Sequence, residues 1–169
     1  RMGTAPTGAV VHAPALPKLL VVTEGEKSLS AIDLVSGDVR WRRTLSGQGT
    51  VRIRRAGKLL VEVSGDASMT AIDVQSGETV WKFCDRLPFP SAPCFDQDSL
   101  FVLGSDSRSQ GRIRSKLHAI DAWTGAARFS AELARGQRPV GSVLTAGNIV
   151  AVVTRDERGI GLQRIGHGL

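Results

Sequence analysis

Residues 29–41 read Leu-Ser-Ala-Ile-Asp-Leu-Val-Ser-Gly-Asp-Val-Arg-Trp, and this stretch occurs twice more without gaps. Residues 69–81 read Met-Thr-Ala-Ile-Asp-Val-Gln-Ser-Gly-Glu-Thr-Val-Trp, and residues 117–129 read Leu-His-Ala-Ile-Asp-Ala-Trp-Thr-Gly-Ala-Ala-Arg-Phe. The shared frame is Ala-x-Asp-x-x-[Ser/Thr]-Gly-x-x-x-[Trp/Phe]. Its aspartates lie 40 residues apart from Asp33 to Asp73 and 48 apart from Asp73 to Asp121, a spacing typical of repeat architectures.

Each copy of the motif predicts the same turn between two strands. Ala-Ile-Asp ends a strand, and the aspartate carboxylate can accept the backbone N–H two residues on. The glycine then supplies the positive φ of a hairpin loop with a bulge, and the next strand carries the aromatic residue. The motif residues are Ala31, Asp33, Gly37 and Trp41, then Ala71, Asp73, Gly77 and Trp81, and finally Ala119, Asp121, Gly125 and Phe129.

Two further strands fit between consecutive motifs, as at Val51–Ile53 and Lys58–Ser64. Four antiparallel strands in about 40 residues are the signature of a propeller blade. The sequence therefore predicts an all-β fold, a β-propeller segment of about four four-stranded antiparallel blades in a partial ring. We expect blades at about 1–45, 46–86, 87–134 and 135–169. A decayed fourth copy of the motif begins near Gly161, with Gly166 in the aspartate position. The sequence ends within this copy, so we expect the last blade to lack its outermost strand.

One segment favours a different structure when it is considered alone. Residues 126–135 have high helix propensity, with Ala126, Phe129 and Leu133 on one helical face. The repeat instead places the first half of this segment in the outermost strand of a blade. We predict the strand, because tertiary context overrides propensity, and leave room for a helical turn near Glu132–Arg135.

The motif resembles the tryptophan-docking repeat of the quinoprotein-like (PQQ-repeat) β-propellers, and the resemblance covers essentially the whole chain. In that family each tryptophan packs against the alanine and glycine of the neighbouring blade's motif, so the resemblance gives this role to Trp41 and Trp81. Phe129 keeps an aromatic surface but has no indole N–H to donate, so we expect a weaker third dock.

The resemblance also implies several ways in which this segment could function. Family members usually close with seven or eight blades, which implies a segment of a longer chain. A closed four-bladed ring, or pairing with further blades or another copy, stays open because open propeller edges expose unpaired strands. The family holds quinone-dependent dehydrogenases, the cofactor-free lipoprotein of outer-membrane protein assembly, and propellers attached to kinases and other scaffolds.

Several absences count against a quinoprotein dehydrogenase. Such an enzyme needs calcium ligands, a catalytic aspartate and aromatic faces, but Asp33, Asp73 and Asp121 are predicted to serve turns. Tyrosine is absent, aromatic residues make up 5%, and no adjacent cysteine pair occurs. We predict free thiols at Cys84 and Cys94 and a strand-face histidine without a ligand role at His118. No catalytic, cofactor-binding or metal-binding residue is therefore assigned, and no cofactor is expected.

Charge points to the kind of partner. The chain carries a net +6 with a pI of about 10.1. The cations have no stacking aromatics interleaved, which counts against nucleic acid. The longest apolar run, Leu19–Val22, is too short to span a membrane. Trp123, at a turn position, is expected to be partly exposed and is a candidate contact residue.

The sequence therefore predicts a non-enzymatic protein-interaction or scaffolding module with a cationic face for an acidic protein partner. The alternatives are a fragment of a PQQ- and calcium-dependent dehydrogenase, and a sensor propeller attached to a kinase or other signalling domain. A location in the cell envelope or periplasm is implied by the family resemblance alone. The expected partner face lies where the loop after the second strand and the links between blades meet, and it comprises Arg108, Arg112, Arg114, Arg135, Arg138, Arg155 and Arg158.

Overall fold

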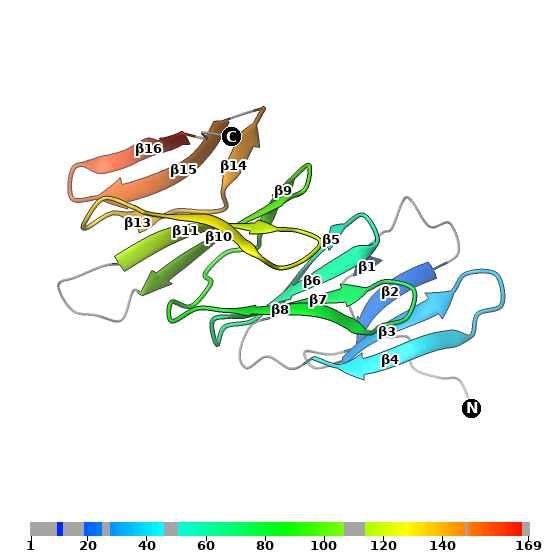
Figure 1. The fold of residues 1–169 in the computed structure, drawn as a ribbon. Coiled ribbons are helices and arrows are strands. Elements are labelled where there is room, and N and C mark those ends of the chain that lie inside the picture. Colours follow the sequence, from blue (N-terminus) through cyan, green and yellow to red (C-terminus); the bar gives the residue numbers. More distant parts are fainter. Residues whose placement is uncertain are drawn as a thin grey trace.

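The computed structural model contains four antiparallel sheets that follow one another along the chain (Figure 1). It describes residues 10–11, 19–24, 28–45, 51–106, 114–147 and 149–166. The strands are β1 (Val10–Val11), β2 (Leu19–Glu24), β3 (Ser28–Asp33), β4 (Val39–Thr44), β5 (Arg52–Ala56), β6 (Leu59–Val63), β7 (Ser68–Asp73), β8 (Thr79–Cys84), β9 (Cys94–Asp96), β10 (Ser99–Asp106), β11 (Arg114–Asp121), β12 (Ala127–Glu132), β13 (Arg138–Pro139), β14 (Leu144–Ala146), β15 (Ile149–Asp156) and β16 (Gly159–Gly166).

The sheets form a partial β-propeller, as the sequence predicts. Strands β1–β4, β5–β8 and β9–β12 make the first three blades, each with its strands paired in chain order. The first and last blades lie at opposite ends of the row, so the ring is not closed (Figure 1). The described residues contain no helix.

The fourth blade departs from the regular pattern on one edge. The short strands β13 and β14 both pair with β15, one beside Thr154 and Arg155 and the other beside Ile149–Ala151. Together they occupy the place that one continuous strand has in the other blades. On the other edge of β15, β16 takes the place of the motif strand.

Two segments whose structure the sequence predicted, residues 126–135 and Val51–Ile53, both form strands. The segment with high helix propensity forms β12, the outermost strand of the third blade, and a turn with a hydrogen bond from Gln137 N to Ala134 O follows it. The blade register therefore decides this segment, and a helical turn near Glu132–Arg135 does not form. The strand predicted at Val51–Ile53 begins one residue later and extends to Ala56.

The motif turns have the geometry that the sequence predicts. The Oδ1 atoms of Asp33, Asp73 and Asp121 accept the backbone N–H two residues on, at 2.9, 2.9 and 3.0 Å. A register shift follows the motif alanine in each blade, and the motif glycines have φ between 73° and 79°. One turn design therefore recurs three times and sets the hairpin between the third and fourth strands.

The hydrophobic core lies between the sheets and not within any one of them. Because side chains of a strand alternate between two faces, each middle blade packs against both neighbours. The third blade shows this clearly: Leu100 and Val102 face the second blade, whereas Phe101 and Leu103 face the fourth. Three such clusters join the four blades pairwise.

Tryptophan docks connect the first three blades. The Trp41 indole N–H donates to Val74 O of the next blade at 2.9 Å, and the Trp81 indole donates to Ala122 O at 3.0 Å. A Cβ placed on Gly77 would lie 2.6 Å from the Trp41 ring, and one on Gly125 would lie 2.7 Å from the Trp81 ring. These glycines therefore let an indole of the preceding blade lie directly on the motif turn.

Phe129 stands at the equivalent position in the third blade and packs differently. Its ring lies 6.5 Å from that of Phe101, at the edge of the cluster shared with the fourth blade. The alanines Ala31 and Ala71 are each paired across the ladder with the tryptophan of their own blade. The dock contacts between blades are thus made to the glycine and to a carbonyl oxygen.

We predict that Trp81→Ala lowers the free energy of unfolding by about 3–5 kcal/mol, because it removes a large side chain that is 7% exposed. Trp41→Ala is expected near the lower end of that range, since Trp41 is only partly buried. Phe129→Ala should cost no more than Trp41→Ala. Urea unfolding measures the free energy of unfolding of all three variants. An unchanged value in both tryptophan variants would contradict the docks.

Alanine substitution of the motif glycines supplies a matched control for the same docks. Gly37 has φ +79° but no atom within 4 Å of an added Cβ, so Gly37→Ala reports backbone strain alone. Gly77→Ala and Gly125→Ala add a clash with an indole ring to the same strain. Both must therefore be more destabilising than Gly37→Ala, and three equal losses would show that the indoles do not depend on these glycines.

Candidate functional site

Two of the three motif aspartates are paired with an arginine of the following strand. Oδ2 of Asp33 accepts from Nε and Nη2 of Arg40 at 3.0 and 2.8 Å. Oδ2 of Asp121 accepts from Nη2 of Arg128 at 2.7 Å. The hydrogen bond from the arginine is the largest cause that holds the pKa of each carboxyl below its usual range. Arg40 is thus a partner of the turn.

Each motif aspartate uses its Oδ1 atom in its own turn, which bears on the quinone and calcium that the fold family implies. A calcium site needs several oxygen ligands brought together. In the described part of the chain, no three His, Cys, Asp or Glu side chains are grouped to hold a metal ion. The donor set present here does not fit a quinone–calcium centre.

The two cysteines lie in different blades. Cys84 ends β8, the outermost strand of the second blade, and Cys94 begins β9, the first strand of the third. Both are free thiols. Cys94 Sγ lies 3.6 Å from Thr145 Oγ1 of the fourth blade, a contact that helps to position β9 against β14.

His118 is a buried contact between blades that sequence reasoning missed. It is 4% exposed on β11, and its Nε2 lies 2.5 Å from Oδ2 of Asp85, which follows β8 of the second blade. Phe83 and Phe89 place their rings 5.5 and 6.2 Å from the imidazole. Burial lowers the pKa of His118, and Lys116 adds to this, while the Asp85 carboxylate opposes it.

The expected partner face is partly within the described residues. Arg114 begins β11, Arg135 lies in the link to the fourth blade, and Arg158 lies in the β15–β16 turn, all exposed. Arg138 and Arg155 are direct cross-strand neighbours. Arg108 and Arg112 lie outside the described residues.

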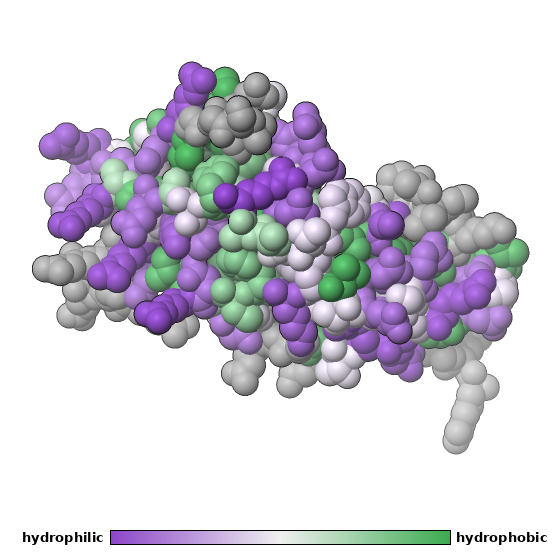
Figure 2. Space-filling model, viewed as in Figure 1, coloured by the Kyte–Doolittle hydropathy of each residue, from purple (hydrophilic) through white to green (hydrophobic). Residues whose placement is uncertain are grey.

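These five arginines lie at one end of the last two blades. The link and the start of β11 are joined by hydrogen bonds from Leu133 N to Ser115 O and from Ser115 Oγ to Gln137 O. In the part of the chain that the structure describes, none of the five guanidinium groups has an ion-pair partner. Hydrophilic side chains dominate the left edge of the molecule, where the β15–β16 hairpin turns (Figure 2).

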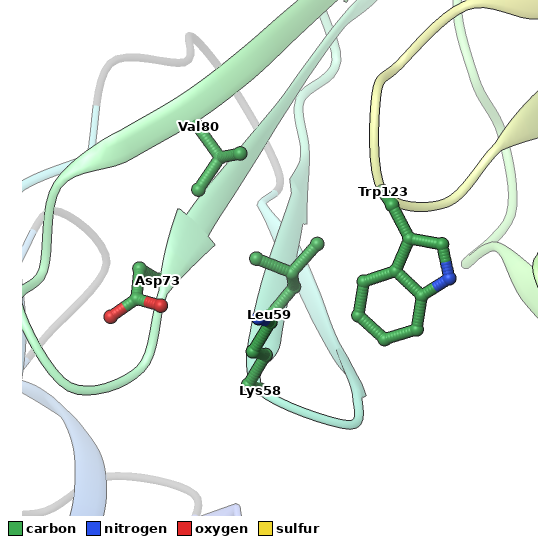
Figure 3. Close-up of a pocket in the computed structure, with 5 residues that line it drawn as sticks. All are labelled: Lys58, Leu59, Asp73, Val80 and Trp123. Carbon is green, nitrogen blue, oxygen red and sulfur yellow. The ribbon is translucent and has the colours of Figure 1, made fainter.

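A pocket of about 550 Å³ lies at the other end of the blades, between the second and third (Figure 3). Its lining residues are Lys58, Leu59, Asp73, Val80 and Trp123. Trp123 is 39% exposed, as its turn position predicts. The sequence signal that could have located this pocket is the residue seven places after each motif aspartate, which is arginine, valine and arginine in turn.

We predict that the free energy of unfolding falls as the pH drops below about 6.5, because the pKa of His118 is lower in the folded than in the unfolded chain. Above that pH the imidazole is neutral in both states. Below it the unfolded chain takes up a proton first, and the loss continues until the pH passes the folded pKa.

Urea unfolding between about pH 7.5 and about pH 5 measures this loss. His118→Gln carries no titrating ring and serves as the control, so its free energy of unfolding should change less over the same range. An identical pH dependence in the variant would show that other groups are responsible.

The comparisons with known proteins agree with this architecture. A family model described as outer membrane protein assembly factor BamB matches residues 2–105, more than half of the chain. BamB from Moraxella catarrhalis has a TM-score of 0.64 and 18% identity, covering 88% of this chain and 43% of that one. The chain thus spans less than half the length of that structure.

Two further structures show the breadth of the fold. A europium-containing methanol dehydrogenase has a TM-score of 0.57 and 19% identity, covering 80% of this chain and 27% of that one. The computationally designed Ika4 protein has a TM-score of 0.63 and 16% identity, covering 99% and 100%. At these identities the likeness shows the fold alone.

No curated protein sequence matches the chain. Nowhere among the described residues is there a helix with the length and apolarity that crossing a bilayer requires. The motif, the interblade docks and the matched family model together show that the chain belongs to the PQQ-repeat family whose model is described as outer membrane protein assembly factor BamB.

Proposed function

We propose that this propeller segment is a non-enzymatic protein-interaction module that binds an acidic surface of a protein partner. One observation carries the proposal: five exposed arginines without an ion-pair partner in the described chain meet at one end of the last two blades. They are Arg114, Arg135, Arg138, Arg155 and Arg158.

The pairing of Arg138 with Arg155 is the strongest part of this argument. Like charges directly opposite each other on neighbouring strands destabilise a sheet. A local arrangement that costs stability is typical of a surface that serves binding. Guanidinium groups suit the purpose because their planar fork donates two hydrogen bonds to one carboxylate.

The family supports an interaction role in place of catalysis. Its description names an assembly factor, and a protein of that kind acts by contacting other proteins. The same description supports a place in the cell envelope or periplasm. Among the described residues, no three His, Cys, Asp or Glu side chains are grouped to hold the calcium ion of the dehydrogenases.

The partner face is tested with two double variants that remove the same charge. Arg138→Gln with Arg155→Gln should weaken capture of an acidic partner in a salt-sensitive way, while stability stays equal or rises because like charges are separated. Arg54→Gln with Lys82→Gln, in the second blade, is the control. Binding can be measured with an immobilised poly-glutamate peptide at two salt concentrations.

Equal losses in both double variants would show that only the overall charge attracts the peptide. Unchanged binding in the Arg138–Arg155 variant would remove this face as the partner site. Since each double variant removes the same net charge, a difference between them reports position.

A second contact surface is the outer face of the fourth blade. Ile160 and Leu162 on β16 are 65% and 66% exposed, and Leu144 and Ile149 are also exposed. Side chains alternate along β15, so Val150 and Val152 face the third blade while Ile149 points the other way. We propose that a further blade, or a second copy of the chain, covers this face.

Self-association of the chain tests this surface directly. Leu162→Lys should shift a concentration-dependent dimer toward monomer in sedimentation equilibrium, because a charged group would be buried in the contact. Val35→Lys, on an exposed turn of the first blade, is the control. A parent chain that stays monomeric at every concentration would exclude a second copy as the occupant.

A further inference from the structure

The second blade lacks a cation that its two neighbours in the repeat provide. The residue seven places after the motif aspartate is Arg40 in the first blade and Arg128 in the third, and each binds Oδ2 of its aspartate. In the second blade this residue is Val80. The strand register is the same, since Val39 and Thr79 both pair with the motif isoleucine.

Asp73 therefore presents one carboxylate oxygen without a cation. Its Oδ1 accepts from the backbone of Gln75 and Ser76 at 2.9 Å each. No described side chain pairs with its Oδ2. The place that a guanidinium fills in the other two blades is here the open space of the pocket beside Val80.

An aromatic face stands across this pocket. Asp73 and Val80 lie on one side of Leu59, and Trp123 lies on the other (Figure 3). The indole N–H of Trp123 donates to Asp98 Oδ1 at 2.7 Å, and the ring end rests on Gly57, where an added Cβ would lie 3.2 Å away. The corresponding residues of the other copies are Val35 and Gln75, so this indole is particular to the third blade.

We infer that this pocket binds an arginine side chain supplied by a protein partner. Its guanidinium would pair with Oδ2 of Asp73, in the position that Arg40 and Arg128 take beside their aspartates. Its planar face and aliphatic stem would lie between Trp123, Leu59 and Val80. Arginine is the side chain that combines a fork for a carboxylate with stacking on an aromatic ring.

Lys58 on the same rim sets a condition on the ligand. In the described chain its ammonium group forms no ion pair with Asp73, and it is exposed at the β5–β6 turn. The positive charge of Lys58 therefore opposes the binding of a cationic ligand beside Asp73.

This site is independent of the proposed acidic-partner face. Trp123 follows the end of β11, whereas Arg114 stands at the beginning of the same strand. The two surfaces thus lie at opposite ends of the blade and select opposite charges. A test of one leaves the other unaffected.

Binding of a blocked Ala-Arg-Ala peptide, followed by the indole Nε1–H resonance of Trp123 in NMR titration, tests the inference. The same peptide with citrulline in place of arginine keeps the shape but loses the charge. We expect at least about tenfold weaker binding of the citrulline peptide, which corresponds to about 1.4 kcal/mol. Equal binding of the two peptides would overturn the inference.

Val80→Arg is the decisive variant, because it supplies the missing arginine within the chain. It should pair with Asp73, leave the fold intact and weaken binding of the arginine peptide at least about tenfold. Asp73→Asn should weaken it similarly, and its amide oxygen can still accept the turn hydrogen bonds. Undiminished binding in either variant would contradict the role of Asp73.

Substitutions of Trp123 and Lys58 test the contribution of each side chain to binding of the arginine. Trp123→Phe keeps an aromatic face and should bind better than Trp123→Ala, measured by calorimetric titration because neither variant has the indole resonance. Lys58→Gln should tighten binding, because it removes a repelling charge. Loss of binding in Lys58→Gln would show that the pocket recognises an anionic group, and would overturn the inference.

Discussion

The contact between an indole ring and the motif glycine of the next blade is the constraint on which the rest of this structure depends. A single four-stranded sheet cannot bury both of its faces, so each blade is stable only against a neighbour. Trp41 and Trp81 each contact the next blade in two ways. The indole ring lies on the motif glycine, and the indole N–H donates to a backbone carbonyl oxygen. The apolar clusters between blades form behind these two contacts.

Departures from the repeat coincide with the surfaces proposed to bind. Where an arginine stands seven places after the motif aspartate, it pairs with that carboxylate, as Arg40 does with Asp33. Where Val80 replaces the arginine, a carboxylate oxygen remains available beside an exposed indole. In the fourth blade the first strand is split into β13 and β14, and there Arg138 lies opposite Arg155. The binding chemistry that we propose is thus carried by positions that the fold does not require.

The two proposed binding surfaces lie at opposite ends of the blades because the strands are antiparallel. Turns between third and fourth strands all lie at one end of the blades, and links between blades lie at the other. The Asp73–Trp123 pocket belongs to the first end and the arginines to the second. His118, buried between the second and third blades beside Asp85, belongs to neither end and contributes to the interblade contact instead.

The sequence by itself determined the blade repeat, the Asx turns at Asp33, Asp73 and Asp121 and the positive φ of the motif glycines, because these depend on local backbone chemistry and on spacing along the chain. The spacing of the repeat also predicted the strand at β12, against the helix propensity of that segment. It also predicted the partial exposure of Trp123, since turn residues lie on the surface. The pairing of His118 with Asp85 and the pocket between Asp73 and Trp123 join residues 33 and 50 positions apart in different blades. Only the tertiary structure decided these contacts, because packing between sheets, and not any local pattern, sets which side chains meet across a blade interface.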